Sequence, residues 1–347
     1  MTAPRWSKRD DLHLVEGYHS PQVEVKVRLN TNESPAPPPR AWVDAVQAEI
    51  GRIDFNRYPD RRAGALRDAI AAFHGRRAAE VLAGNGSNEV LQALCLALGG
   101  PGRRVAAFEP TYALHSHIAR ITGTAVITGQ RTSDFGIDLD EVRRVARESP
   151  AITFLCSPNN PTGGAERREV VEEVLAVAPG IVVVDEAYGQ FAPWSALELV
   201  ADDVPLVVVR TFSKTWSMAG FRLGYLVGPA SLVAAVEEVV LPYHLDAVKQ
   251  VAGCLALEMV GEMESRVTDL VAERERVIAA LRRLDVDVWP SDANFVLFRP
   301  RRRAAREMWD GLVERSVLVR DCSSWPRLEG CLRVTIGTPA EDDAFLV

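Results

Sequence analysis

Residues 151–188 read AITFLCSPNNPTGGAERREVVEEVLAVAPGIVVVDEAY, and this stretch decides the fold class. Two short runs rich in β-branched residues, at 152–158 and 181–188, flank a segment of helical periodicity at 167–178. A strand, a helix and a second strand in that order place the two strands parallel in one sheet. The alternation continues on both sides, with strands expected at 104–110, 124–129, 206–213 and 224–228 and helices at 89–98, 112–121 and 138–148. We therefore expect an α/β fold whose mostly parallel sheet is covered by helices on both faces.

Composition and periodicity divide the chain into three regions. Residues 1–40 are rich in proline and charge, contain one candidate strand at 25–30, and are expected to form an N-terminal arm. Residues 41–240 are expected to form a large domain, which begins with helices at 42–50 and 65–75. Residues 241–347 are expected to form a small α+β domain with helices at 265–284 and 303–315 and strands at 292–298, 317–321 and 331–337. The sequence Thr338-Pro-Ala-Glu341 predicts the start of a short last helix, because it has the spacing of a capping box with proline at the first helical position.

The composition is that of an ordinary globular protein. Of 347 residues 47% are hydrophobic and 25% are charged, and the net charge is −7. This acidic balance argues against binding to nucleic acid, which needs a basic face, and no apolar run approaches the ~18 residues of a membrane span. The five cysteines form no C-x-x-C pair and the histidines form no H-E-x-x-H pattern. We therefore expect reduced thiols, no metal site and a cytoplasmic location.

Polar motifs follow three of the expected strands at the point where each strand ends. They are SPNNPTG at 157–163, DEAY at 185–188 and RTFSK at 210–214. The carboxyl ends of parallel strands meet at one edge of the sheet, and ligands of open α/β sheets bind along that edge. The three motifs therefore predict one ligand crevice.

Lys214 and Arg222 indicate which ligand this crevice holds. Lys214 ends an apolar strand, where partial burial lowers the pKa of an amine and makes it a nucleophile for a carbonyl group. Arg222 lies eight residues further along and can hold a phosphate through two hydrogen bonds. A lysine considered alone is more often a solvated surface residue, but the motifs around Lys214 argue against that here. An amine that attacks an aldehyde, beside a guanidinium that binds phosphate, predicts a pyridoxal-phosphate site.

Other polar residues fit the same cofactor. Ser87, in GNGSNE, is expected to cap a helix whose free N–H groups point at an anion. Asp185 follows a buried apolar run, where its carboxylate needs a cation such as a pyridinium nitrogen; a helix cap or an internal ion pair would also explain it. Tyr112 can stack on an aromatic ring or simply pack in the core. Asn160 and Tyr188 can donate hydrogen bonds to a phenolate oxygen.

Four motifs in this order, GNGSNE, SPNNPTG, DEAY and SKTWSMAGFR, resemble those of the fold-type I pyridoxal-phosphate aminotransferases, and the resemblance spans about residues 18–337. It implies a seven-stranded sheet in the large domain. It also implies that Lys214 forms the Schiff base and shuttles the proton, that Asp185 pairs with the pyridine nitrogen, and that Tyr188 is the third catalytic residue. The residues implied to bind the cofactor are Tyr58, Ser87, Asn88, Tyr112, Asn160, Asp185, Tyr188, Thr211, Ser213, Lys214 and Arg222.

Within that group the motifs LNTNESP, RYPD, PSDANFVLF, VLVRD and LEGCLRVTIGT resemble the histidinol-phosphate aminotransferases. That resemblance implies exchange of an amino group between L-histidinol phosphate and 2-oxoglutarate in histidine biosynthesis. One substrate carries a phosphate and the other carries two carboxylates, so one anion pocket must serve both substrates. The resemblance assigns substrate binding to Tyr18, Asn32, Arg320 and Arg333, and it implies a homodimer in which Tyr58 reaches the cofactor phosphate of the neighbouring subunit and the N-terminal arm contributes contacts.

Two other kinds of protein would share part of these motifs. An aromatic amino-acid aminotransferase or a phosphothreonine decarboxylase of the same fold would keep Lys214, Asp185 and Arg222, because the cofactor carries the difficult chemistry and the protein selects the substrate. The paired Arg320 and Arg333 favour histidinol phosphate over these substrates. A transcription regulator with an aminotransferase-like domain would need a DNA-binding module ahead of it, and the first 40 residues are too few and too rich in proline to form one.

Overall fold

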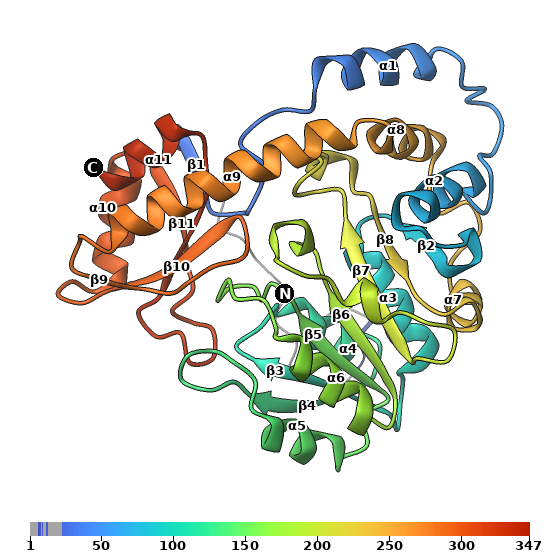
Figure 1. Ribbon diagram of the computed structural model, residues 1–347, viewed down its shortest axis with the longest axis horizontal. Coiled ribbons are helices and arrows are strands. Elements are labelled where there is room, and N and C mark those ends of the chain that lie inside the picture. The colour runs from blue at the N-terminus through green and yellow to red at the C-terminus, as the bar shows by residue number, and fades with distance from the viewer. Residues whose placement is uncertain (1–5, 8, 10–11, 13–22) are drawn as a thin grey trace.

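The computed structural model describes residues 6–7, 9, 12 and 23–347. A seven-stranded sheet forms its centre (Figure 1). In spatial order its strands are β2 (Val81–Gly84), β8 (Gly224–Val227), β7 (Leu206–Thr211), β6 (Ile181–Asp185), β5 (Ile152–Cys156), β3 (Arg104–Glu109) and β4 (Ala125–Gln130). β8 runs opposite to the other six strands, which are parallel to one another, so the expected mostly parallel sheet is confirmed.

Helices cover both faces of this sheet because its strands are apolar on both sides. On β6, Val182 and Val184 point into one layer and Val183 into the other. The first layer holds α1 (Arg40–Ile50), α2 (Gly64–His74), α5 (Leu139–Ala146), α6 (Arg168–Val177) and α8 (Ala247–Leu257). The second holds α3 (Ser87–Leu98), α4 (Leu114–Ile121) and α7 (Ala230–Glu237).

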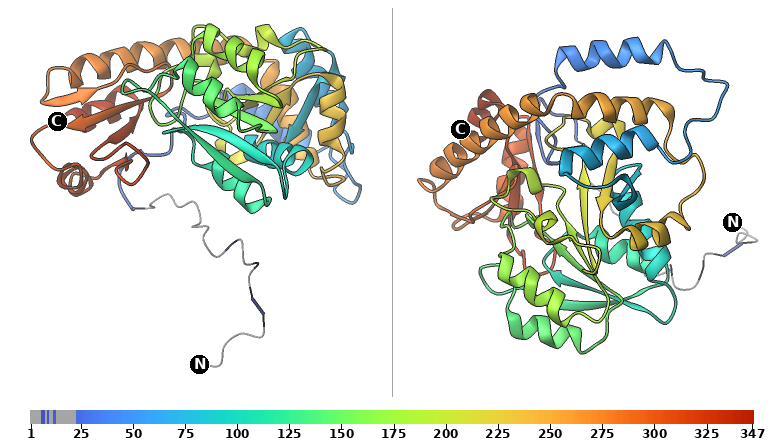
Figure 2. Two further views of the ribbon diagram at one scale, coloured as in Figure 1. Left: turned by 90° about the horizontal axis from the view of Figure 1, so that it is seen from below. Right: turned by 45° about the vertical axis from the view of Figure 1, so that its right-hand side comes forward.

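A smaller five-stranded sheet lies beside the first (Figures 1 and 2). Its order is β1 (Val27–Leu29), β11 (Val317–Asp321), β12 (Leu332–Thr335), β10 (Phe295–Pro300) and β9 (Val286–Val288). Helices α9 (Val260–Leu281), α10 (Ala305–Glu314) and α11 (Pro339–Leu346) share its core. Because β1 pairs with β11, the chain crosses from the small sheet to the large one directly after β1. That connection passes the candidate site.

The structure corrects several local expectations. Two strands that the sequence did not predict are β2, with four residues, and β9 (Val286–Val288), with three. Ser87 is not the cap of α3; Gly86 is the capping residue with φ +83°, and Ser87 is the first helical residue. The short last helix is confirmed, since the Thr338 backbone N–H donates to Glu341 Oε2 at 2.8 Å in a capping box.

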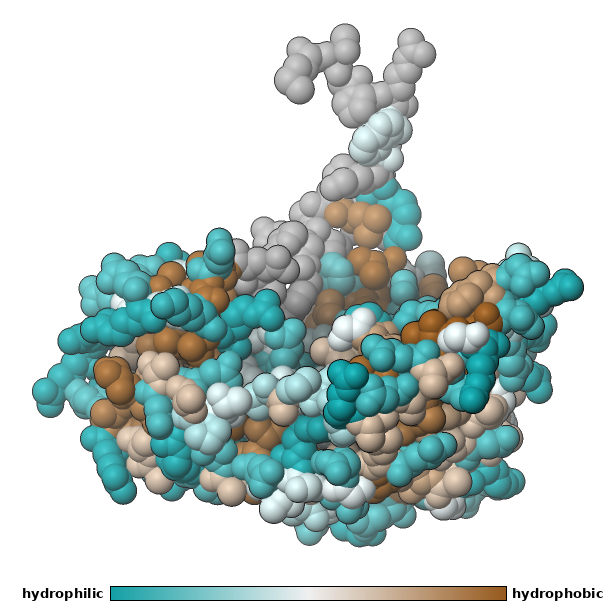
Figure 3. Space-filling model, turned by 90° about the horizontal axis from the view of Figure 1, so that it is seen from above, coloured by the Kyte–Doolittle hydropathy of each residue, from teal (hydrophilic) through white to brown (hydrophobic). Residues whose placement is uncertain are grey.

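The face that carries α1 and α9, viewed in Figure 3, is largely hydrophilic with hydrophobic patches between the charged residues. No helix within the described part of the chain is long and apolar enough to cross a membrane. The described residues also contain no group of three metal-ligating side chains.

Candidate active site

A cavity of about 360 Å³ lies where β5, β6 and β7 end. The three motifs predicted to share one edge of the sheet do share it. Most of the predicted site residues line this cavity: Asn32, Ser87, Asn88, Tyr112, Asn160, Asp185, Tyr188, Thr211, Ser213, Lys214, Arg222 and Arg333. Asn30, Thr31 and Glu33 also line it, and the sequence analysis did not single them out.

One end of the cavity gathers donors suited to a phosphate. Arg222 Nη1 donates to Ser213 Oγ at 3.2 Å, and Thr211 Oγ1 donates to the same oxygen at 3.0 Å. A Cβ atom on Gly86 would lie 2.8 Å from Arg222 Nη2, so glycine at this position lets the guanidinium approach the start of α3. Hydroxyl groups, a guanidinium and the first N–H groups of a helix therefore converge here, and this donor set fits a phosphate group.

Lys214 lies in the middle of the cavity. Its Nζ donates to Thr31 O at 3.2 Å and lies 5.6 Å from the centre of the Tyr188 ring. Burial lowers the pKa of this amine to about 7, and the positive charges of Arg333 and Arg222 act in the same direction, against the opposing effect of Glu33. A large fraction of the amine is therefore unprotonated near neutral pH, which is the form that attacks an aldehyde.

Asp185 forms the buried floor of the site. Its Oδ1 accepts a hydrogen bond from the Ala187 N–H at 3.1 Å, and its Oδ2 lies 3.0 Å from His115 Nε2. The His115 ring stacks on Phe154, with centroids 4.9 Å apart, and meets the Tyr112 ring edge to face. The sequence analysis did not connect His115 with this aspartate; the signal available was a buried carboxylate that needs a partner. Together they offer a fixed negative charge to a ring nitrogen.

Tyr188 and Asn32 join the two sheets through one hydrogen bond. Asn32 Nδ2 donates to Tyr188 Oη at 2.9 Å, and Asn32 Oδ1 accepts from Thr335 Oγ1 of β12 at 3.0 Å. Burial raises the pKa of the Tyr188 phenol, so the group stays protonated and keeps an O–H to donate. This arrangement fits a donor to a phenolate oxygen.

Arg320 and Arg333 lie directly opposite each other on β11 and β12. Only 7% of Arg320 and 4% of Arg333 are exposed, so two facing residues both carry a positive charge that is largely shielded from water. Arg333 reaches the cavity, where Nη1 donates to Asn160 Oδ1 and Nη2 donates to Asn30 O at 2.8 Å. Arg320 does not line the cavity; its guanidinium lies 5.9 Å from the Trp325 ring centre.

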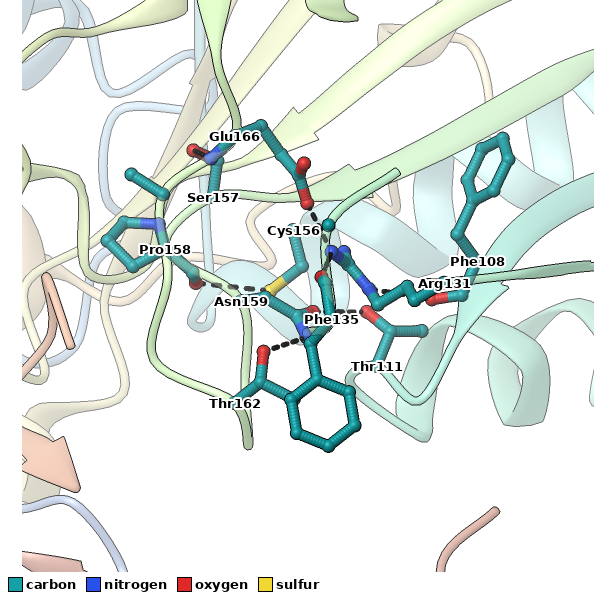
Figure 4. A network of polar contacts seen from close by, with 12 residues as sticks. Phe108, Thr111, Arg131, Phe135, Cys156, Ser157, Pro158, Asn159, Thr162 and Glu166 are labelled. Atoms are coloured by element: carbon teal, nitrogen blue, oxygen red, sulfur yellow. Dashed lines mark hydrogen bonds and ion pairs between the residues drawn. The ribbon is translucent and has the colours of Figure 1, made fainter. Parts of the chain in front are cut away.

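A buried polar network supports the SPNNPTG loop that carries Asn160 (Figure 4). Asn159 Nδ2 donates to Pro110 O at 3.0 Å and to Thr162 Oγ1 at 2.7 Å, and Asn159 Oδ1 accepts from Thr111 at 2.8 Å. Beside it, an Arg131–Glu166 ion pair at 2.6 Å ties the end of β4 to the end of this loop. These contacts fix the loop and hence Asn160. A larger hollow of about 700 Å³ adjoins the network and is lined mainly by residues 131–140 and 162–170.

Tyr58, like Arg320, does not line the cavity. Tyr58 is 80% exposed and stacks on Tyr243 with ring centroids 4.5 Å apart, so it does not contact the site of its own chain. Tyr18 lies outside the described residues.

Comparisons with known proteins agree with this geometry. A family model described as aminotransferase class I and II matches residues 24–347. Histidinol-phosphate aminotransferase of Streptomyces avermitilis is 46% identical over 97% of this chain and 94% of its own length. Histidinol-phosphate aminotransferase of Thermobifida fusca is 45% identical over 97% of this chain and 93% of its own length. A solved structure, histidinol-phosphate aminotransferase from Sinorhizobium meliloti in complex with pyridoxal-5'-phosphate, matches 93% of this chain and 89% of its own with a TM-score of 0.85; at 24% identity this likeness shows the fold. The chain therefore belongs to the class I and II aminotransferases and, within them, to the histidinol-phosphate aminotransferases.

Proposed function

We propose that this chain uses pyridoxal 5'-phosphate to transfer an amino group from L-histidinol phosphate to 2-oxoglutarate, giving imidazole acetol phosphate and glutamate, in histidine biosynthesis. The observation that carries this proposal is the pair of buried arginines on β11 and β12, one of which reaches the cavity that holds Lys214 and Asp185. The names and 42–46% identities of the relatives favour histidinol phosphate over an aromatic amino acid or phosphothreonine.

The cofactor, when bound, supplies a reactive aldehyde and a ring that withdraws electrons from the substrate. The chain supplies the binding groups. Ser87, Asn88, Thr211, Ser213 and Arg222 would hold the phosphate, and Tyr112 would stack on the ring. Asp185 would keep a positive charge on the ring nitrogen, and Asn160 and Tyr188 would donate to the ring oxygen.

Lys214 has two tasks in this scheme. Its unprotonated amine binds the cofactor aldehyde, and once released it takes a proton from the substrate and returns it at a neighbouring atom. Its lowered pKa suits both tasks, since the amine can accept and give up a proton near neutral pH. Lys214 and Arg333 line the same cavity, so a substrate whose anion contacts Arg333 would share that cavity with the amine.

We also propose that the protein is a cytoplasmic homodimer in which Tyr58 reaches the cofactor phosphate of the second copy. Tyr58 is exposed, and so are three other large hydrophobic residues near it in the chain or the fold: Phe55, Leu241 and Tyr243. A second copy would cover this apolar surface. The cytoplasmic location is supported by the cysteines, all five of which are free.

A single-turnover assay tests the function. Holoenzyme is mixed in turn with histidinol phosphate, phenylalanine and phosphothreonine, and the change in cofactor absorbance and the products are recorded. The proposal predicts fastest conversion with histidinol phosphate. Faster conversion of phenylalanine would replace it with an aromatic aminotransferase, and loss of carbon dioxide from phosphothreonine would replace it with a decarboxylase.

A further inference from the structure

The chain segment that leaves β1 is tied to the active site at three successive residues. Asn30 O accepts from Arg333 Nη2 at 2.8 Å, Thr31 O accepts from Lys214 Nζ at 3.2 Å, and Asn32 Nδ2 donates to Tyr188 Oη at 2.9 Å. These partners are the groups assigned to the substrate anion, to the amine chemistry and to the ring oxygen. The segment is therefore fixed relative to every reacting part of the site.

Glu33 is the next residue, and its position is set by the contacts of Asn32. Asn32 has a left-handed backbone with φ 55°; its N–H donates to Thr335 Oγ1 at 2.9 Å and its carbonyl accepts from Asn294 Nδ2 at 3.2 Å. These two bonds fix the peptide units on both sides of Asn32, and with them the direction in which the chain continues. Glu33 then lines the cavity, and because 46% of its side chain is exposed it lies at the solvent-open rim.

The Glu33 carboxylate retains its capacity to accept hydrogen bonds. Its ion pair with Arg28 is long, at 3.8 Å, and both side chains are open to solvent, with 46% of Glu33 and 66% of Arg28 exposed. Such a pair contributes little and is readily rearranged. The other carboxylate among the described lining residues, Asp185, lies at the floor and already accepts from Ala187 and contacts His115. Glu33 is thus the acidic group available at the entrance.

The proposed amino donor has three recognisable parts, and two of them already have partners. The phosphate is assigned to Arg333, the arginine of the pair that lines the cavity, and the amino group to Lys214 and the cofactor. The third part is a ring with an N–H donor, and the acceptor available to it among the described lining residues is the solvent-exposed carboxylate of Glu33. A carboxylate is a strong acceptor for such an N–H.

We propose that Glu33 is a specificity-determining residue that accepts a hydrogen bond from the imidazole N–H of the amino donor. This inference rests on the proposed function. It carries a consequence for the second substrate: the distal carboxylate of 2-oxoglutarate has no N–H to offer and has the same charge as Glu33. Removing the Glu33 charge should therefore slow the half-reaction with histidinol phosphate and leave the half-reaction with 2-oxoglutarate unchanged or faster.

The test combines three variants with two donors. The donors are histidinol phosphate and the phosphate ester of phenylalaninol, which has a phenyl ring and no ring N–H. In the wild type the ratio of kcat/KM for the two donors should favour histidinol phosphate, and Glu33→Ala should lower this ratio about 10- to 100-fold, the range for losing a hydrogen bond to a charged group. The ratio for Glu33→Gln should fall between those of the wild type and Glu33→Ala, since the amide oxygen still accepts a hydrogen bond. Arg28→Ala, which removes the ion-pair partner and keeps the carboxylate, should preserve the ratio.

The half-reaction with 2-oxoglutarate separates recognition from a structural role. It starts from the aminated cofactor form of each variant and should run at the wild-type rate or faster in Glu33→Ala. Equal losses in both half-reactions, or a donor ratio within twofold of wild type, would overturn the inference while leaving the proposed function intact. Wild-type enzyme that does not convert histidinol phosphate would overturn the proposed function itself.

Discussion

Replacing Arg333 by lysine should weaken capture of histidinol phosphate while keeping the positive charge. The guanidinium uses its planar shape in the structure: Nη1 donates to Asn160 Oδ1, Nη2 donates to Asn30 O at 2.8 Å, and its carbon lies 5.1 Å from the Phe295 ring centre. The Nε–H is buried and has no hydrogen-bond partner among the described residues. One side chain thus holds two parts of the site, and each of its Nη atoms carries a second N–H that can be offered to the substrate anion.

The size of the expected loss in kcat/KM follows from the number of hydrogen bonds that lysine cannot replace. A single ammonium cannot satisfy both acceptors and the substrate with the same geometry, so at least one hydrogen bond of a charged donor is lost. Such a bond contributes roughly 1.5–3 kcal/mol. At about 1.4 kcal/mol for each tenfold change, kcat/KM for histidinol phosphate should fall roughly 10- to 100-fold.

The assay measures whether this loss depends on the substrate phosphate. Wild type and Arg333→Lys are each assayed with histidinol phosphate and with histidinol, which lacks the phosphate. Histidinol should react poorly with the wild type and lose much less on mutation, so the two changes should show a large interaction energy. An interaction near zero, with histidinol phosphate still a good substrate, would show that another group binds the phosphate.

Four further predictions concern the cofactor and the assembly. Lys214→Ala should abolish borohydride trapping of pyridoxal phosphate; trapping on a different lysine would contradict the assignment. In the wild type, the rate at which apoprotein captures the cofactor should rise as the pH increases through about 7, because the amine loses its proton at its lowered pKa; a rise only near pH 10 would contradict burial of the amine. Asp185→Ala should slow the half-reaction by orders of magnitude while the cofactor still binds to Lys214, and near-wild-type turnover would remove Asp185 from the mechanism. Sedimentation of the holoenzyme should give a dimer, and a fully active monomer at the assay concentration would refute a site shared through Tyr58.

Much of the large sheet could be predicted from the sequence because its central strands are apolar on both faces and end in polar motifs. The same regularity placed Lys214, Asp185 and Asn160 at one edge. The strand β2 could not be predicted, since four residues, VLAG, are too few to show a period and are stabilised by pairing with β8, more than 140 residues away in the chain. The prediction that Ser87 caps α3 was wrong. Ser87 has the usual side chain for a cap, but the close approach of Arg222 requires glycine at position 86, and Gly86 is the capping residue.

The side-chain partners of the site were harder to predict than its location. Arg320 and Arg333 fall on two strands expected from the sequence, 317–321 and 331–337, and the register places them opposite each other. Which of them reaches the cavity depends on side-chain direction. The pairing of His115 with Asp185 joins a helix to a strand far along the chain. Glu33 lies in a connection without periodicity, and only the hydrogen bonds of Asn30, Thr31 and Asn32 reveal its place at the rim.

The central claim is that one cavity combines pyridoxal-phosphate chemistry with recognition of a phosphorylated amine. The most direct measurement is the single-turnover rate of the holoenzyme with histidinol phosphate, phenylalanine and phosphothreonine under identical conditions. We predict that histidinol phosphate converts the bound cofactor fastest and that the aminated enzyme then returns to its starting spectrum on addition of 2-oxoglutarate. Faster reaction with phenylalanine, or release of carbon dioxide from phosphothreonine, would contradict the account.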